Sequence, residues 1–211
     1  MELVTLPIGL VESNVYLLCF GKDVLMIDAG GVPPPVHFWG MNLRGVLCTH
    51  GHFDHICALD ELSAAWGCPI FLHEEEGSLF RSSRRRLGLP PEPDFAVTAL
   101  RAGQVLTCAD FSFAEICDFS ITVLHTPGHS KGSVCFLYEE REDVSQPAFL
   151  FSGDTVFEGT VGRTDLEGGS FAELKASVAR IKSLEPGTVI LPGHGEKTTV
   201  NREIARNPYF T

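Results

Sequence analysis

The segment His50-Gly51-His52-Phe53-Asp54-His55 constrains this chain more than any other, because it places four candidate metal ligands directly after a short apolar run. His50 and His52 are two residues apart, so their side chains project to the same side of an extended backbone, and Asp54 repeats that phase. Four ligands in six residues are too many for one ion on steric grounds, so the spacing favours two divalent ions that share a bridging group. Imidazoles and carboxylates without thiolates suit Zn, Fe, Mn or Co and do not single out one of them.

Three later apolar runs also end in polar turns that carry a histidine or an aspartate. These turns are Thr126-Pro127-Gly128-His129, Ser152-Gly153-Asp154 and Pro192-Gly193-His194. Side chains on loops at one edge of a sheet can converge on one cleft. The predicted metal ligands are therefore His50, His52, Asp54, His55, His129, Asp154 and His194.

The remaining histidines and the cysteines are expected to be structural. An isolated histidine is more often hydrogen-bonded in the core or at the surface than bound to a metal, which is the interpretation kept for His37, His73 and His125. The seven cysteines are odd in number, scattered and never spaced as CxxC, and most have apolar neighbours. They are Cys19, Cys48, Cys57, Cys68, Cys108, Cys117 and Cys135. This usage predicts buried, reduced thiols and a cytoplasmic location.

Length and charge limit the classes of partner. The chain has 211 residues, which predicts one compact domain over residues 1–211. Its 16 basic and 27 acidic residues give a formal net charge of −11, which argues against nucleic acid and anionic membranes as partners. No apolar run approaches the roughly 20 residues that span a bilayer, and the N-terminus has no signal-peptide pattern. The expected partner is a small molecule, and the oligomeric state stays open.

The order of apolar runs and turn residues predicts the fold. Strands, a helix, further strands and a second helix indicate an α+β, four-layer αββα sandwich with the active site at one edge of two packed sheets. The main helices are expected over 56–66 and 171–184, with shorter ones over 36–41, from 74 onward and over 200–206. Strands are expected over 14–20, 24–27, 45–48, 69–73, 111–113, 120–124, 133–138, 148–152 and 188–191. The basic cluster of Arg81 with Arg84–Arg86 is expected to be a solvated helix end.

Taken together, the four ligand-bearing segments at 50–55, 127–129, 153–154 and 192–195 resemble the metallo-β-lactamase superfamily. More narrowly, the chain is similar to the glyoxalase II (hydroxyacylglutathione hydrolase) branch in its short single-domain form. The branch is indicated by residues 151–157, by Gly162-Arg163-Thr164-Asp165-Leu166 and by Asn207-Pro208. Matching segments run from about Asn14 to Phe210. The resemblance implies a metallo-β-lactamase type of sandwich.

The resemblance also implies how the ligands divide. His50, His52 and His129 would bind one ion, and Asp54, His55 and His194 the other. Asp154 would bridge the two ions together with a water or hydroxide. Asp28 matches an acidic position that supports the motif loop, residues 50–55, without binding a metal itself. The implied cofactors are two divalent ions, with Zn as the first choice and Fe or Mn as alternatives.

These ligands predict hydrolysis without a serine or cysteine nucleophile. A bound metal lowers the pKa of water from about 15.7 to about 7, which supplies hydroxide at neutral pH. Asp54 is the catalytic candidate that orients this hydroxide or shuttles its proton. A thiolate leaves with little help from an acid, which favours an acyl thioester such as S-lactoylglutathione as the substrate.

Two departures from glyoxalase II concern substrate binding. The C-terminal helical domain that holds glutathione in that enzyme is not expected here. The segment at 162–165 replaces a glutathione-binding segment, and its Arg163 would either clamp a substrate carboxylate or pair with Asp165.

Two alternatives remain from the sequence. Persulfide dioxygenases share the pattern at 162–165 and hold one iron at positions that match His50, His129 and Asp154. A metal-binding protein without catalytic activity is the alternative from a different functional class. Metal stoichiometry and oxygen uptake would separate the first alternative from a dinuclear hydrolase.

Overall fold

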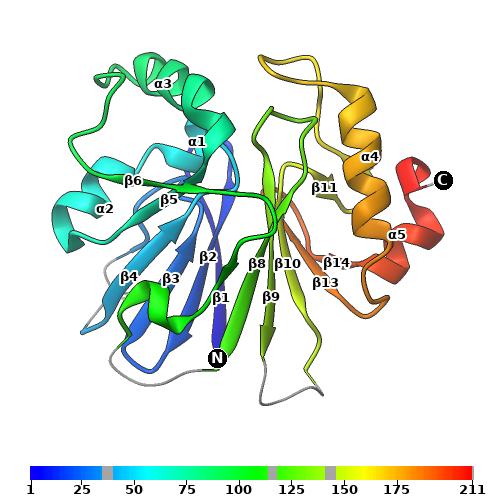
Figure 1. The fold of residues 1–211 in the computed structure, drawn as a ribbon, viewed down its shortest axis with the longest axis horizontal. Helices are drawn as coiled ribbons and strands as arrows, with labels where there is room; N and C mark the ends of the chain where they lie inside the picture. Colours follow the sequence, from blue (N-terminus) through cyan, green and yellow to red (C-terminus); the bar gives the residue numbers. More distant parts are fainter. Residues whose placement is uncertain (35–39, 114–117, 141–145, 211) are drawn as a thin grey trace. The chain divides into compact units, whose positions relative to one another are not determined.

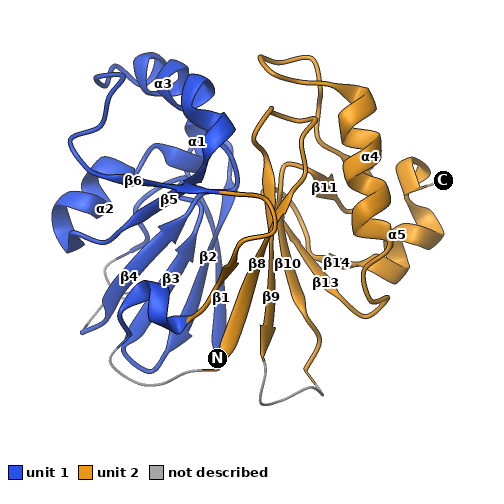
Figure 2. Ribbon diagram, in the orientation of Figure 1, with its two compact units in different colours: residues 1–100, 108–117 blue, residues 101–107, 118–211 orange. Residues whose placement is uncertain are grey.

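The computed structural model describes residues 1–34, 40–113, 118–140 and 146–210 (Figure 1). Residues 36–39 of the helix expected over 36–41, which include His37, lie outside this part of the chain, as does Cys117. The chain divides into two compact units, residues 1–100 with 108–117, and residues 101–107 with 118–211 (Figure 2). Within the described residues, no helix is long and apolar enough to cross a membrane. The expectation of one domain over residues 1–211 stays a prediction.

The first unit contains a mixed six-stranded sheet in which the strands follow their sequence order from β1 to β6. β1 to β3 pair antiparallel, whereas β3 to β6 pair parallel. The strands are β1 (Glu2–Ile8), β2 (Ser13–Phe20), β3 (Asp23–Ile27), β4 (Asn42–Leu47), β5 (Ile70–His73) and β6 (Val97–Leu100). Parallel neighbours end at the same edge, so the residues after β3 and β4 lie side by side, and the backbone N–H of Asp28 donates to the carbonyl of Leu47 at 2.9 Å.

The described residues of the first unit also form five short helices, of which α1, α2 and α3 contribute apolar side chains to the core cluster of the sheet. They are α1 (Phe53–Ile56), α2 (Leu59–Trp66), the short 3₁₀ helix η2 (Glu74–Glu76), α3 (Gly77–Arg86) and the 3₁₀ helix η3 (Cys108–Phe111). The predicted helix over 56–66 is interrupted between Ile56 and Leu59, and it ends as expected at Gly67, whose φ is +59°. Ile56, Leu59 and Leu62 join one core cluster with Val15 and Leu17 of β2.

The strand expected over 111–113 is wrong. Phe111 ends η3, and Ser112 has a φ of +53°, which breaks an extended backbone. The alternating apolar pattern instead serves an aromatic cluster, because Phe111 packs on Phe71 and Phe113 packs on Phe20.

The second unit contains a six-stranded sheet whose strands lie in the order β14-β13-β10-β9-β8-β7. Its elements are β7 (Val105–Leu106), β8 (Phe119–His125), β9 (Val134–Glu140), β10 (Phe149–Gly153), β11 (Val156–Phe157), β12 (Thr160–Val161), α4 (Phe171–Lys182), β13 (Val189–Pro192), β14 (Thr198–Thr199), α5 (Val200–Arg206) and η4 (Pro208–Phe210). β11 and β12 form a separate hairpin. Leu174, Val178 and Ile181 of α4 pack on Leu150 and Ile190 of the sheet, as their spacing predicted.

The ligand-bearing turns of this unit share one edge of the sheet. β8 and β10 are both antiparallel to β9, and β10 is parallel to β13, so β8, β10 and β13 point the same way. Their carboxyl ends carry His129, Asp154 and His194 in turn.

Arg84 corrects the expectation of a solvated helix end. Its side chain is buried, and its guanidinium donates to both carboxylate oxygens of Asp60 at 2.6 and 3.0 Å. Its Nε donates to the carbonyl of Pro90 at 2.8 Å. The planar guanidinium also lies over the rings of Phe80 and Phe95. Arg84 therefore fastens α3 to α2 and to the loop that follows α3, a role for which five fixed donors suit arginine.

Candidate metal centre

The loop after β4 gathers four predicted ligands in the first unit. His50, His52 and His55 are buried, and the ring of His50 lies 4.8 Å from that of His52 and 4.3 Å from that of His55, measured between centroids. The Oδ2 of Asp54 lies 3.5 Å from the Nε2 of His55. Because α1 starts within the motif, Asp54 and His55 occupy the first turn of a helix while His50 and His52 precede it.

Asp28 organises this loop from behind. Its Oδ1 accepts the backbone N–H of Thr49 at 2.7 Å, and its Oδ2 contacts the Nδ1 of His55 at 2.8 Å. An ionised carboxylate only accepts hydrogen bonds, so Nδ1 of His55 carries the proton and Nε2 is left as the nitrogen that can bind a metal. Asp28 has a φ of +60°, a left-handed conformation that aspartate and asparagine tolerate better than most residues.

Thr49 extends the same control to His50. Its hydroxyl lies 2.8 Å from the Oδ2 of Asp28 and 3.0 Å from the Nδ1 of His50. Since the hydroxyl donates its only hydrogen to the carboxylate, it accepts a hydrogen bond from the Nδ1–H of His50. The imidazoles of His50 and His55 are thus both held in the tautomer that presents Nε2. Sequence reasoning missed Thr49, although its place directly before His50 is a usable signal.

In the second unit, Asp154 stands between two imidazoles. Its Oδ2 lies 3.4 Å from the Nε2 of His129, and its Oδ1 lies 3.8 Å from the Nε2 of His194. Both separations exceed the upper end, about 3.2 Å, of ordinary N–H···O hydrogen bonds. A carboxylate that turns each oxygen toward a different imidazole has the arrangement required of a bridging ligand.

His129 and His194 are held by neighbours that the sequence did not reveal. The Nδ1 of His129 donates to the carbonyl of Arg163 at 2.8 Å, which leaves Nε2 available for a metal. The ring of Phe157 packs edge-on against His194 at 6.2 Å between centroids. Gly162 approaches Asp154 so closely that a Cβ there would lie 1.8 Å from the Asp154 carbonyl oxygen. None of these three contacts leaves a periodic or compositional signal in the sequence.

Arg163 is exposed and pairs with Asp165. Its Nε and Nη2 each donate to one carboxylate oxygen at 2.7 Å. This hydrogen-bonded pairing lowers the pKa of Asp165 to about 2 and raises the pKa of Arg163. Of the two roles considered for Arg163, the ion pair with Asp165 is present in the structure.

The other described histidines and cysteines make structural contacts. His73 is buried, and its Nδ1 accepts the backbone N–H of Glu75 at 3.4 Å, while the Nε2 of His125 contacts the carbonyl of Lys131 at 3.0 Å. The six described cysteines are free thiols, four of them buried. Burial raises the pKa of Cys68 and of Cys135 to about 11, so both remain neutral at physiological pH.

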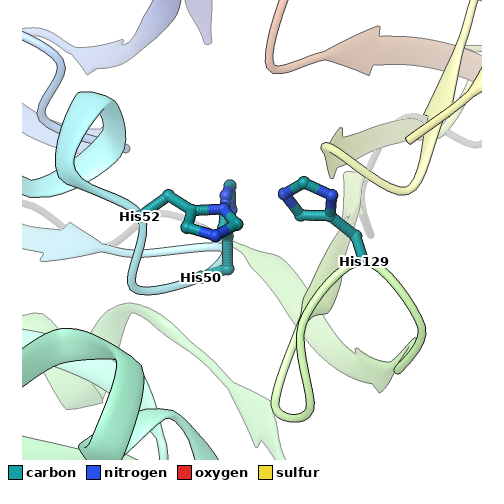
Figure 3. Close-up of side chains that lie close together, drawn as sticks. All are labelled: His50, His52 and His129. Atoms are coloured by element: carbon teal, nitrogen blue, oxygen red, sulfur yellow. The ribbon is translucent and has the colours of Figure 1, made fainter. Parts of the chain in front are cut away.

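All seven predicted ligands are candidate metal ligands among the described residues. Figure 3 shows the imidazoles of His50 and His52, which follow β4, and of His129, which follows β8. The candidate ligands are five imidazoles and two carboxylates, with no thiolate, which are residue types that suit Zn, Fe or Mn. The protonated Nδ1 atoms of His50, His55 and His129 add to this fit, because each leaves Nε2 for coordination.

Comparisons with known proteins agree on one family. The family model described as the metallo-β-lactamase superfamily matches residues 8–194. A crystal structure of the BLEG-1 B3 metallo-β-lactamase is 32% identical, with a TM-score of 0.82 over 100% of both chains. The structure of TTHA1623 in a di-iron-bound form is 35% identical, with a TM-score of 0.77 over 99% of this chain and 100% of that one.

One relative carries a named activity close to the expected one. The hydroxyacylglutathione hydrolase GloC of Haemophilus influenzae is 29% identical over 222 residues, covering 100% of this chain and 98% of its own length. The likeness to these proteins confirms the expected α+β fold of the metallo-β-lactamase type.

Proposed function

The chain belongs to the metallo-β-lactamase superfamily of metal-dependent hydrolases, and from this premise we propose that it hydrolyses an acyl thioester at a dinuclear metal centre. His50, His52 and His129 hold one ion in this proposal, and Asp54, His55 and His194 hold the other. Asp154 bridges them. The observation that carries the proposal is the carboxylate of Asp154, whose two oxygens face two different imidazoles. Zn is the first choice of metal, and the di-iron-bound form of TTHA1623 supports Fe as the alternative.

The residues of this chain orient the ligands and handle a proton. When bound, the metal pair supplies Lewis acidity and an ionised water at neutral pH. Asp28, Thr49 and the Arg163 carbonyl fix which nitrogen of His55, His50 and His129, respectively, would face the metals. Asp54, where its carboxylate is not fully occupied as a ligand, would orient the attacking water or hydroxide and shuttle its proton.

Two arguments favour a thioester over other acyl substrates. A thiol of pKa about 8.5 leaves as a thiolate without a general acid, so the chain needs no further catalytic group for the leaving step. The relative GloC is described as a hydroxyacylglutathione hydrolase, which supports an S-lactoylglutathione-like substrate. The proposal commits to the thioester class, a small molecule, and leaves the acyl group and the thiol carrier to experiment.

A substrate panel on protein of known metal content tests this proposal. Release of free thiol from S-lactoylglutathione and from other acyl thioesters is expected, with kcat/KM of about 10⁴ M⁻¹s⁻¹ or more for the best of them. A β-lactam, the substrate class of the BLEG-1 relative's family name, is expected to be opened far more slowly. Faster opening of the β-lactam would reject the thioester assignment. Oxygen uptake with glutathione persulfide and one iron per chain would instead establish the dioxygenase alternative.

We propose that Arg163 binds a carboxylate of the substrate, which would replace Asp165 as its partner. We expect Arg163→Ala to raise KM about tenfold for a glutathione thioester, because a charge-assisted bidentate contact is lost. A neutral N-acetylcysteamine thioester, which offers no carboxylate, should keep its KM. Arg202→Ala is the matched control, since it removes another exposed arginine that pairs with an acidic residue, Glu158. Equal effects of Arg163→Ala on both substrates would show that Arg163 does not bind the substrate carboxylate.

A further inference from the structure

A buried carboxylate lies behind the motif loop and has no place in the centre described above. Glu76, the last residue of η2, is fully buried. Its Oε2 accepts the backbone N–H of Gly51 at 2.6 Å. Gly51 is the residue between His50 and His52, so this contact holds the peptide that joins two predicted ligands.

The burial of Glu76 requires an explanation, because the two glutamates before it are exposed to solvent. A carboxylate loses its hydration when it is buried, which is unfavourable unless the charge is compensated by strong hydrogen bonds. Glu74 and Glu75 belong to the same short helix and are exposed. The short hydrogen bond from Gly51 compensates part of the cost of burying the Glu76 carboxylate.

The loop and the start of α3 are in close contact around this bond. A Cβ on Gly51 would lie 2.9 Å from the backbone nitrogen of Phe80 and 3.0 Å from the Oε2 of Glu76. Only glycine fits here without a shift of the backbone. The position between the two histidines thus faces α3 directly, and its N–H points to Glu76.

The helix that follows Glu76 is itself anchored. Arg84 of α3 makes a two-pronged contact with Asp60 of α2 and donates to the Pro90 carbonyl. A residue can position another only if its own backbone is held in place, and these partly buried contacts hold α3.

We propose that Glu76 is a positioning residue for the metal centre, which acts through the Gly51 peptide to keep His50 and His52 in their binding orientation. This inference rests on the metal sites of the proposed function and is independent of the thioester substrate. The essential property is the hydrogen-bond acceptor on side chain 76, and a neutral acceptor of the same shape should replace it.

Metal binding by Glu76→Leu and Glu76→Gln tests the proposal. Each purified chain is stripped of metal, titrated with Zn against a chelator, and loaded with Co(II) for its visible absorption spectrum. Leucine leaves the Gly51 N–H without its acceptor, and we expect Zn affinity to fall about 10- to 100-fold with a changed Co(II) spectrum. Glutamine keeps an acceptor and should restore both the affinity, to within about threefold, and the spectrum. Glu75→Leu makes the same chemical change at an exposed neighbour and should behave as the unmodified chain.

The outcomes separate clearly. Unchanged Zn affinity in folded Glu76→Leu would overturn the proposal, as would a loss of tenfold or more in Glu76→Gln. If the leucine variant does not fold, the glutamine variant decides alone, because its acceptor predicts near-normal binding. These titrations need no substrate, so a chain that binds metal as expected but hydrolyses no thioester would reject the proposed function and leave this inference standing.

Discussion

Removal of the metal ions is expected to lower thioester hydrolysis by about 10³-fold or more, and adding a divalent metal back should restore it. The reason is the nucleophile. Water ionises with a pKa of about 15.7 in bulk and about 7 on a metal, a difference of roughly nine units or about 12 kcal/mol. The ligand set that would hold the ions consists of imidazoles and carboxylates alone. Activity should be measured on chelated, dialysed protein and again after adding Zn, Fe(II) or Mn(II), with metal content determined by mass spectrometry.

The stoichiometry in the same experiment distinguishes the dinuclear centre from the alternatives. Two ions per chain at full activity would support the proposed division of ligands, and His55→Ala should lose one of them together with most of the activity. A His55→Ala chain that retained both ions and full hydrolysis would contradict the dinuclear mechanism. Far-UV circular dichroism of the chelated chain serves as the control, because a collapse of secondary structure would also remove activity.

Asp28→Asn is expected to reduce activity by about 10²- to 10⁴-fold through a change in the tautomer of His55. Asparagine tolerates the left-handed backbone at this position and can still accept the Thr49 N–H through its carbonyl oxygen. Its amide nitrogen would then face Nδ1 of His55 where an acceptor stands now. Nδ1 would have to accept a hydrogen bond, Nε2 would carry the proton, and the imidazole could no longer bind a metal through it.

Metal content and the temperature of unfolding should be measured on this variant together. We expect less than two ions per chain and a modest change in stability, because the fold keeps its backbone and most of its hydrogen bonds. Asp94→Asn makes the same substitution at an exposed aspartate and serves as the control. Full metal content with normal activity in Asp28→Asn would mean that the contact between Asp28 and His55 does not select the tautomer.

The sequence predicted the elements whose apolar residues recur at a regular spacing and missed those too short to show such a spacing. The apolar run at 14–20 and the spaced residues of 171–184 gave β2 and α4 nearly to the residue, because burial of one face demands those patterns. β11, β12 and β14 have two residues each, too few to show any alternation. The strand at 111–113 was predicted wrongly, because two phenylalanines that pack on other rings imitate a strand.

The candidate site divides in a similar way. Its ligand types were predicted from a short, dense pattern at strand ends, whereas the role of Asp28 was predicted from the resemblance to the metallo-β-lactamase superfamily. Glu76 and Gly162 could not be derived, since their contacts depend on where other segments lie in space. Arg84 was assigned to a helix end correctly and to solvent wrongly, because Asp60 lies 24 positions earlier and no local signal links them.

The backbone at Asp28 carries a consequence for how this chain can vary. A left-handed φ of +60° admits glycine, asparagine and aspartate with little strain, while the contacts to Thr49 and His55 demand an acceptor at both oxygens. Aspartate is the only residue that meets both requirements. Among variants with another residue at position 28, we therefore expect some that fold but bind little metal and others that do not fold. The variants that keep the left-handed backbone would show the effect of losing the carboxylate alone.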